Sequence, residues 1–175
     1  MLERIQYWDD NIINWVGRLH TPILNKIMIA ISTLGSKGFI WFAICIPFLV
    51  YRPWRMTGAN ILVGLSIAHI AGELIIKHVV CRIRPCNKLE DDELIVKRPR
   101  YYSFPSGHTT ASFAVVAVTA FRCQPAVSIP ILVLAFLMGF SRLYLRVHYL
   151  TDVLCGLVLG LLCGFLSVEI FNHLF

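Results

Sequence analysis

Long apolar stretches, separated by short polar segments, make up most of the chain after residue 37. Five of them stand out: Gly38–Tyr51, Met56–Val80, Phe104–Phe121, Ala126–Leu143 and Leu150–Phe171. A helix needs about 20 apolar residues to cross the hydrocarbon core of a bilayer. The last four stretches qualify by length, whereas the first is marginal and spans only if its flanking residues reach toward the interface. The pattern therefore predicts an all-α bundle of membrane-spanning helices.

The first 36 residues follow a different pattern. Apolar side chains recur at helical spacing between residues 2 and 19, at Ile5, Trp8, Ile12, Trp15 and Val16, which indicates an amphipathic helix. Because tryptophan favours the membrane–water boundary, we expect this helix on the bilayer surface. The alternative is a short helix packed on the protein itself. Thr21–Leu34 is a second predicted helix, too short to span comfortably.

The composition agrees with a membrane protein. Hydrophobic residues make up 57% of the chain and charged residues 15%, and the mean hydropathy is +0.70. Soluble domains carry about 25% charged residues, so these values exclude an ordinary soluble enzyme, a disordered chain and a disulfide-framed secreted domain. The net charge is +6, but the basic residues do not form a separate soluble domain. This argues against nucleic acid as a partner and favours an anionic lipid or substrate.

The cysteines show no zinc-type spacing. Only Cys81 and Cys86 of the six cysteines lie in a polar loop, and the others lie in apolar runs. We expect free thiols, and a pair between these two stays open if the loop faces an oxidising compartment.

Three polar clusters occur at the ends of predicted helices. They are Lys77 with Arg84-Pro85, the run Ser103–His108, and Ser141-Arg142 followed by His148 and Asp152. Alternation of the spans places the long loop Cys81–Ser103 and the segment around His148 on the same face of the membrane. Ionisable residues at membrane depth are costly and are functional candidates by default. We therefore expect one anion site, assembled from distant parts of the chain.

The spacing within the clusters predicts separate roles. His148 and Asp152 are four residues apart, so on a helix they share a face and can hydrogen-bond. A carboxylate on one imidazole nitrogen fixes the tautomer and leaves the other nitrogen free to attack. Pro105 begins a helix whose free backbone N–H groups point at an anion.

Other residues of the clusters would bind and protonate the same anion. Ser106 adds a hydroxyl donor, Gly107 permits close approach of the backbone, and His108 is placed to protonate a leaving oxygen. Three cations would neutralise a phosphoryl group: Lys77, Arg84 and Arg142. Glu73 precedes Lys77 by four residues and could orient it, although a purely structural pair is an equal alternative.

These residues resemble the signature of the type 2 phosphatidic acid phosphatases, also called lipid phosphate phosphatases. The family pattern is Lys-x6-Arg-Pro, then Pro-Ser-Gly-His, then Ser-Arg-x5-His-x3-Asp. This chain fills every position in order, with Lys77…Arg84-Pro85, Pro105-Ser106-Gly107-His108 and Ser141-Arg142…His148…Asp152. A three-part match is far more specific than a short motif, and the resemblance covers roughly residues 20–172.

The resemblance implies a helical membrane bundle that hydrolyses a lipid phosphate or diphosphate without a metal or other cofactor. It implies that His148 is the nucleophile that forms a phosphohistidine, Asp152 its partner and His108 the acid and then the base. Lys77, Arg84, Ser106, Gly107 and Arg142 would bind the phosphate. Undecaprenyl diphosphate, phosphatidylglycerophosphate and phosphatidic acid are the expected substrate types. A non-catalytic lipid-phosphate binding or transport protein is the alternative.

The chain departs from the family at its N-terminus. Family members commonly have six spans, whereas the sequence predicts five, or six if Thr21–Leu34 inserts. We expect one domain over residues 1–175, with interfacial helices in 1–36 and the catalytic bundle in 37–175. The resemblance places the site on the extracytoplasmic face, although a count of loop cations would place it in the cytoplasm. The oligomeric state is not predicted.

Overall fold

The computed structural model describes residues 2–174, without the side chains of Leu2 and Lys37, so residues 1 and 175 of the predicted domain lie outside it. Eight α-helices occur in the described range: α1 (Leu2–Gly17), α2 (Pro22–Leu34), α3 (Phe39–Val50), α4 (Arg55–His69), α5 (Lys77–Val80), α6 (Gly107–Arg122), α7 (Pro125–Tyr144) and α8 (Leu150–Leu174). A π-helical segment, η3 (Ile70–Ile76), joins α4 to α5. No strand occurs over residues 2–174, so the predicted all-α fold is confirmed.

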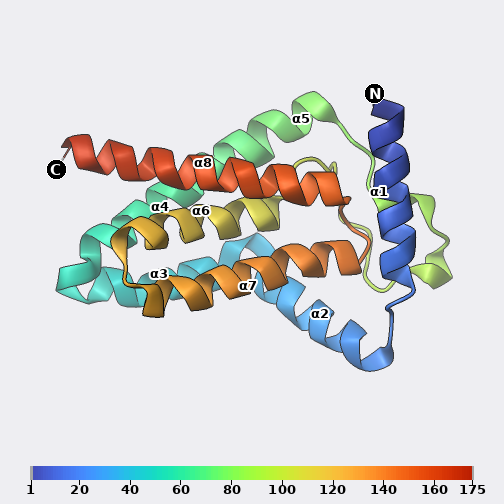
Figure 1. Cartoon of the computed structure of the whole chain (residues 1–175), viewed down its shortest axis with the longest axis horizontal. Coiled ribbons are helices and arrows are strands. Elements are labelled where there is room, and N and C mark those ends of the chain that lie inside the picture. Colours follow the sequence, from blue (N-terminus) through green and yellow to red (C-terminus); the bar gives the residue numbers. More distant parts are fainter. Residues whose placement is uncertain (1, 175) are drawn as a thin grey trace.

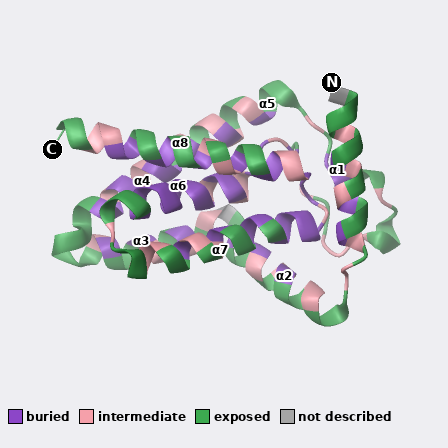
Figure 2. Ribbon diagram, in the orientation of Figure 1, coloured by how far each residue is buried: buried purple, intermediate pink, exposed green. Residues whose placement is uncertain are grey.

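Helix α6 lies at the centre of the bundle and contacts α4, α7 and α8 (Figure 1). Nearly all of its side chains from Thr109 to Thr119 are buried, as the colouring in Figure 2 shows. Glycines on α8 allow the two helices to approach closely. A Cβ on Gly160 would come 2.4 Å from the Thr110 carbonyl oxygen, and one on Gly164 would come 2.4 Å from the Ala114 carbonyl oxygen. The glycine spacing in the sequence thus serves helix packing.

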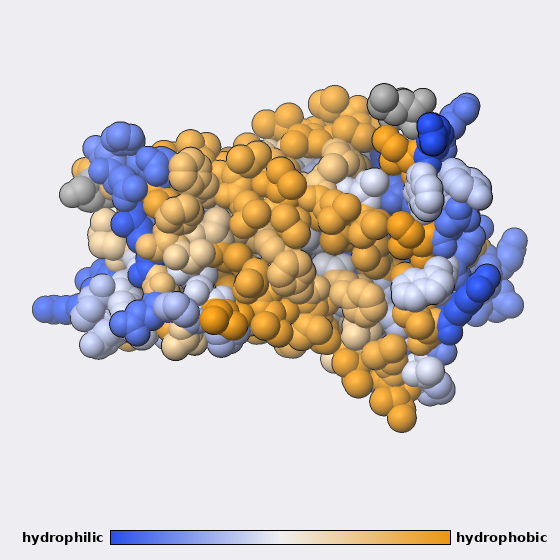
Figure 3. Space-filling model, in the orientation of Figure 1, coloured by the Kyte–Doolittle hydropathy of each residue, from blue (hydrophilic) through white to orange (hydrophobic). Residues whose placement is uncertain are grey.

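The outer faces of the helices are apolar. On α7 the exposed side chains include Ile129, Val133 and Phe136, and on α8 they include Leu154 and Val158. Figure 3 shows an apolar band across the middle of the face in view, with polar residues at both ends. A broad exposed apolar band flanked by polar ends is what a bilayer covers.

Three helical stretches are long and apolar enough to cross a membrane: Arg52–Lys88, Pro125–Tyr144 and Leu150–Leu174. Helices α2 and α3, bent by 54° at their junction, make a fourth if the pair is one span. This count is lower than the five to six spans predicted from the sequence, for two reasons. The predicted span Phe104–Phe121 becomes α6, which has only 16 residues. The second predicted interfacial helix and the marginal first span become the two halves of the bent pair.

Helix α1 runs across one end of the bundle, where it contacts α7 and α8 (Figure 1). Its inner face buries Asp9, Ile13 and Val16. Its outer face exposes Trp8 and Trp15, at 63% and 58% of their surface. The predicted amphipathic helix is therefore present, and one of its faces packs on the protein.

Candidate active site

One cavity of about 430 Å³ brings the three polar clusters together. Its polar wall includes residues from all three clusters and from η3: Glu73, Lys77, Arg84, Gly107, His108, Arg142 and His148. The remaining wall is mostly apolar and includes Phe42, Leu65 and Ala68. Distant parts of the chain thus meet in one place, as the alternation of the helices predicted.

His148 lies in the link between α7 and α8 and is only 2% exposed. The sequence predicted that His148 and Asp152 share a helical face, and this is wrong because α8 begins at Leu150. Asp152 instead accepts a hydrogen bond from the Tyr149 backbone N–H at 2.8 Å, as a capping carboxylate does. This turn still places His148 Nδ1 3.7 Å from Asp152 Oδ2.

Arg84 determines which nitrogen of His148 carries the proton. Its Nη1 lies 2.9 Å from His148 Nε2 and also donates to the Val147 carbonyl oxygen at 2.8 Å. A guanidinium only donates hydrogen bonds, so Nε2 is the acceptor and the proton sits on Nδ1, facing Asp152. Burial, and after it the charge of Arg84, lower the pKa of His148 well below its ordinary value of 6.5. The imidazole is therefore neutral at neutral pH, with its free lone pair on Nε2.

Asp152 is fully buried and is held by more partners than the sequence indicated. Ser103 Oγ donates to its Oδ2 at 2.5 Å, and Arg82 Nη1 donates to its Oδ1 at 2.7 Å. Ser103 began one of the predicted clusters, but neither it nor Arg82 was assigned a role. No local spacing could reveal these contacts, because Ser103 and Arg82 are 49 and 70 residues from Asp152.

Positive charge dominates the polar wall of the cavity. Lys77 and Arg84 are each 4% exposed and Arg142 is 8% exposed. Lys77 Nζ pairs with Glu73 Oε1 at 2.5 Å, which confirms the contact predicted for these two residues. Within the described part of the chain, no carboxylate pairs with Arg84 or Arg142. Buried cations need a compensating charge, so the cavity is suited to an anion.

Arg142 and His108 have unused hydrogen-bonding atoms. Arg142 Nη1 donates to Ser32 Oγ, whereas its Nε is buried without a partner among the described atoms. His108 Nε2 is likewise buried and unpaired in that set. Buried polar atoms are normally paired, and both residues line the cavity, so both can bind a ligand there.

The start of α6 differs in one respect from the prediction. Ser106 is fully buried, and its backbone N–H donates to the Asp152 carbonyl oxygen at 3.0 Å. The residues that line the cavity include Gly107 and His108 but not Ser106. A Cβ on Gly107 would come 2.1 Å from Glu73 Oε1, so a side chain there would displace the Glu73 carboxylate.

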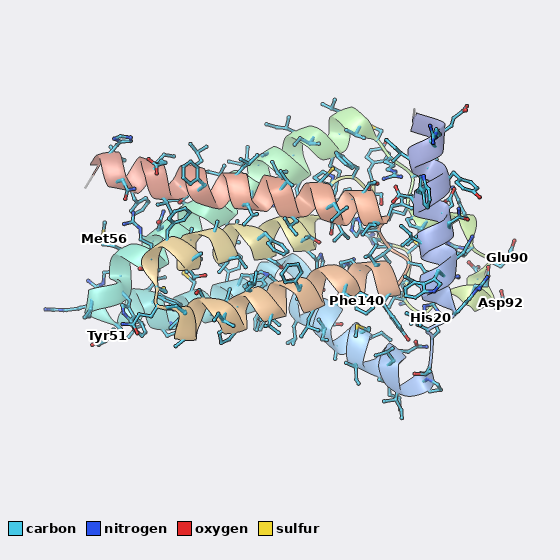
Figure 4. All side chains as sticks on the ribbon, viewed as in Figure 1. His20, Tyr51, Met56, Glu90, Asp92 and Phe140 are labelled. Carbon is cyan, nitrogen blue, oxygen red and sulfur yellow. The ribbon has the colours of Figure 1, made fainter. Side chains whose placement is uncertain are left out.

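None of the four acidic residues of the long loop lines the cavity. Glu90 and Asp92 are at the outer edge of the molecule, at the end opposite Tyr51 and Met56 (Figure 4). Asp91 pairs with Arg98. Cys81 is exposed, Cys86 is buried, and both are free thiols. No group of three or more metal-binding side chains occurs among the residues that the structure describes.

Comparison with known proteins agrees with this geometry. The sequence model of the PAP2 superfamily matches residues 54–175. An undecaprenyl-diphosphatase from Sulfolobus acidocaldarius is 32% identical over 148 residues, which cover 84% of this chain and 70% of that protein. Phosphatidylglycerophosphatase B from Bacillus subtilis is 31% identical over 176 residues, covering 93% of this chain and 82% of that protein.

A solved structure is similar along nearly the whole chain. The crystal structure of a transmembrane PAP2 type phosphatidylglycerolphosphate phosphatase from Bacillus subtilis superposes with a TM-score of 0.80. The sequence identity is 30%, and the match covers 98% of this chain and 88% of the other.

Proposed function

The chain belongs to the PAP2 superfamily, and from this membership we propose that it is a membrane enzyme that hydrolyses a lipid phosphate or diphosphate. One observation carries the proposal. A buried, neutral His148 presents its Nε2 to a cavity that also holds Lys77, Arg84 and Arg142. A nucleophile beside fixed cations is the arrangement that phosphoryl transfer requires.

In the first step, the phosphate enters and accepts hydrogen bonds from Arg84, Arg142 and Lys77. Arg84 Nη1 then leaves the lone pair of His148 Nε2, which attacks phosphorus. The bond from phosphorus to the leaving oxygen breaks as the new P–N bond forms. His108, which takes up a proton once the anionic phosphate lies beside it, donates that proton to the leaving oxygen and becomes neutral. The product that departs is a lipid alcohol from a monoester, or a lipid monophosphate from a diphosphate.

In the second step, water attacks the phosphohistidine. His108 accepts a proton from the water, the P–N bond breaks, and its electron pair returns to Nε2. Asp152 stabilises the positive charge that His148 carries in the intermediate, because its Oδ2 faces the protonated Nδ1. Each proton in the cycle has a donor or acceptor among His108, the substrate and water.

The two walls of the cavity fit the two parts of a lipid substrate. The cationic wall would hold the phosphate, while Phe42, Leu65 and Ala68 would line the path of the apolar tail from the bilayer. We place the cavity end of the molecule on the extracytoplasmic side of the membrane. Helix α1 would lie in the interface there, since Trp8 and Trp15 face outward.

A phosphate-release assay on the purified protein tests this function. The substrates are undecaprenyl diphosphate, phosphatidylglycerophosphate and phosphatidic acid, each with excess chelator. We expect release from at least one lipid, and a loss of at least about a thousand-fold in His148→Ala. A His148→Ala variant with wild-type rates would exclude the assigned nucleophile. Lipid binding without release from any of the three lipids would instead indicate a non-catalytic binding protein.

A further inference from the structure

A buried ion pair connects helix α1 to the candidate catalytic carboxylate. Asp9 of α1 is 1% exposed, and its Oδ2 lies 2.7 Å from Arg82 Nη2. The other end of the same guanidinium, Nη1, lies 2.7 Å from Asp152 Oδ1. Asp9 Oδ1 also accepts a hydrogen bond from the Thr151 backbone N–H at 3.1 Å, in the first turn of α8.

We propose that α1 supports the active site, with Asp9 and Arg82 as positioning residues that set the orientation and the electrostatic environment of Asp152 and, through it, of His148. This inference rests on the proposed function, because it assigns the two residues to the same reaction. Neither residue is among those that line the catalytic cavity.

The contacts of Arg82 argue that its position is fixed. Besides the two carboxylates, Arg82 Nη2 donates to Gln6 Oε1 at 2.8 Å, and Nη1 donates to Thr151 Oγ1 at 2.7 Å. The guanidinium carbon also lies 4.1 Å from the centre of the Tyr149 ring. Tyr149 and Thr151 both lie between His148 and Asp152, so the guanidinium contacts the turn that joins these two residues.

The cost of burying these charges argues against a role for Asp9 and Arg82 in packing alone. Apolar residues of similar size usually stabilise a protein at least as well as a buried ion pair. The neighbouring pair between α1 and the long loop provides the contrast, since Asp10 and Lys88 are about half exposed and 3.1 Å apart. That surface pair does not reach Asp152.

Charge balance explains what the buried pair does. The negative charge of Asp9 compensates the positive charge of Arg82. The negative charge of Asp152 therefore still acts on the proton at His148 Nδ1. The other charged or titratable groups around His148 are Arg84 of the loop, Arg142 of α7, and Glu73, Lys77 and His108 on the cavity wall. Removing Asp9 makes the surroundings of His148 more positive, and removing Arg82 makes them more negative.

The test compares Asp9→Asn with Arg82→Gln and uses Asp10→Asn as the matched control. The first readout is the pH dependence of kcat/KM, whose acid limb reports ionisation of the free enzyme. We expect this limb to move to lower pH in Asp9→Asn and to higher pH in Arg82→Gln, by at least about 0.5 unit each. In Asp9→Asn/Arg82→Gln the limb should return toward the wild-type position, because the charge balance is restored. A role in packing alone would not produce opposite shifts.

The second readout does not require turnover. Deuterium exchange at the imidazole C2 of His148, followed by mass spectrometry across pH, should shift in the same directions as the acid limb. In both single variants kcat should fall about 10- to 100-fold, as for residues that orient a catalytic ligand. KM should stay within about threefold, because neither side chain contacts the cavity. Asp10→Asn should match the wild type in every measurement.

Thermal unfolding in detergent establishes that each variant is folded. If Asp9→Asn does not fold, Arg82→Gln is compared with Arg82→Lys. Only Arg82→Gln removes the positive charge, so only this variant should move the acid limb. The inference would be overturned if the acid limb of kcat/KM did not move in the single variants, or if it moved in the same direction in both. A wild-type protein that releases no phosphate would overturn the proposed function instead, while exchange at His148 would still test the role of Asp9 and Arg82.

Discussion

Two contacts fix the protonation state of the buried His148 imidazole. Arg84 donates to His148 Nε2, and Asp152 faces Nδ1. This arrangement keeps His148 in the one neutral tautomer whose lone pair points into the cavity. In the proposed mechanism, Arg84 exchanges His148 for a phosphate oxygen before attack, so substrate binding would itself expose the nucleophile.

The pH dependence of activity follows from this environment. Burial, and then the charge of Arg84, lower the pKa of His148 below 6.5. The nucleophile is active only when neutral, and a lowered pKa keeps it neutral to a lower pH. We therefore expect the acid limb of kcat/KM to lie below pH 6.5, with activity retained at pH 6. An acid limb at or above pH 6.5 that is attributable to His148 would contradict this environment.

The residues that line the cavity are easier to predict from sequence than those that we propose support them. His108, His148, Lys77, Arg84 and Arg142 lie in short motifs, and the structure brings all five to one cavity. Their ionisable groups are conspicuous among apolar residues, which is why the sequence reveals them.

The supporting residues have no such signal. Arg82 was one of several loop cations, and Asp9 was one polar position on an amphipathic helix. Their contacts join positions 73 residues apart, which only the fold can specify.

At the scale of the helices, the sequence predicted where most elements occur but not how they end. No pattern of apolar residues in the sequence marks the π-helical segment η3, which contains Glu73. None marks the bend between α2 and α3 either. Likewise, the four-residue spacing of His148 and Asp152 suggested a helix, whereas α8 begins two residues after His148. Capping contacts and tertiary packing decide these boundaries, and periodicity does not report them.

Close packing of α6 and α8 places a steric limit on one glycine. A Cβ on Gly160 would meet the Thr110 backbone oxygen at 2.4 Å, and a backbone atom cannot move aside easily. Gly160→Ala should therefore lower the stability by about 1–3 kcal/mol. Gly64→Ala is the matched control, because its Cβ would have its nearest neighbour at 3.5 Å. Equal midpoints for the two variants, in thermal or SDS-induced unfolding, would contradict the packing of these helices.

The distribution of charge over the whole molecule raises the question of which end faces the cytoplasm. Cytoplasmic loops usually carry the excess of lysine and arginine, and the end with the cavity is the more basic one. Several of these cations are not free loop charges, however. Arg84 and Arg142 are buried at the cavity, and Arg82 is paired with Asp9 and Asp152. Charges committed to a site say little about the orientation of the chain.

The orientation can be measured with a cysteine at each end. Cys81 is exposed near the cavity, and Tyr51 is exposed at the opposite end (Figure 4). A variant that keeps only Cys81 would be compared with one in which Tyr51→Cys supplies the only thiol. If the site is extracytoplasmic, a membrane-impermeant maleimide should label Cys81 in intact spheroplasts, and the Tyr51→Cys variant only after lysis. The reverse labelling pattern would place the site on the cytoplasmic side, as a count of loop charges alone does. The lipid substrate would then enter the site from the inner leaflet.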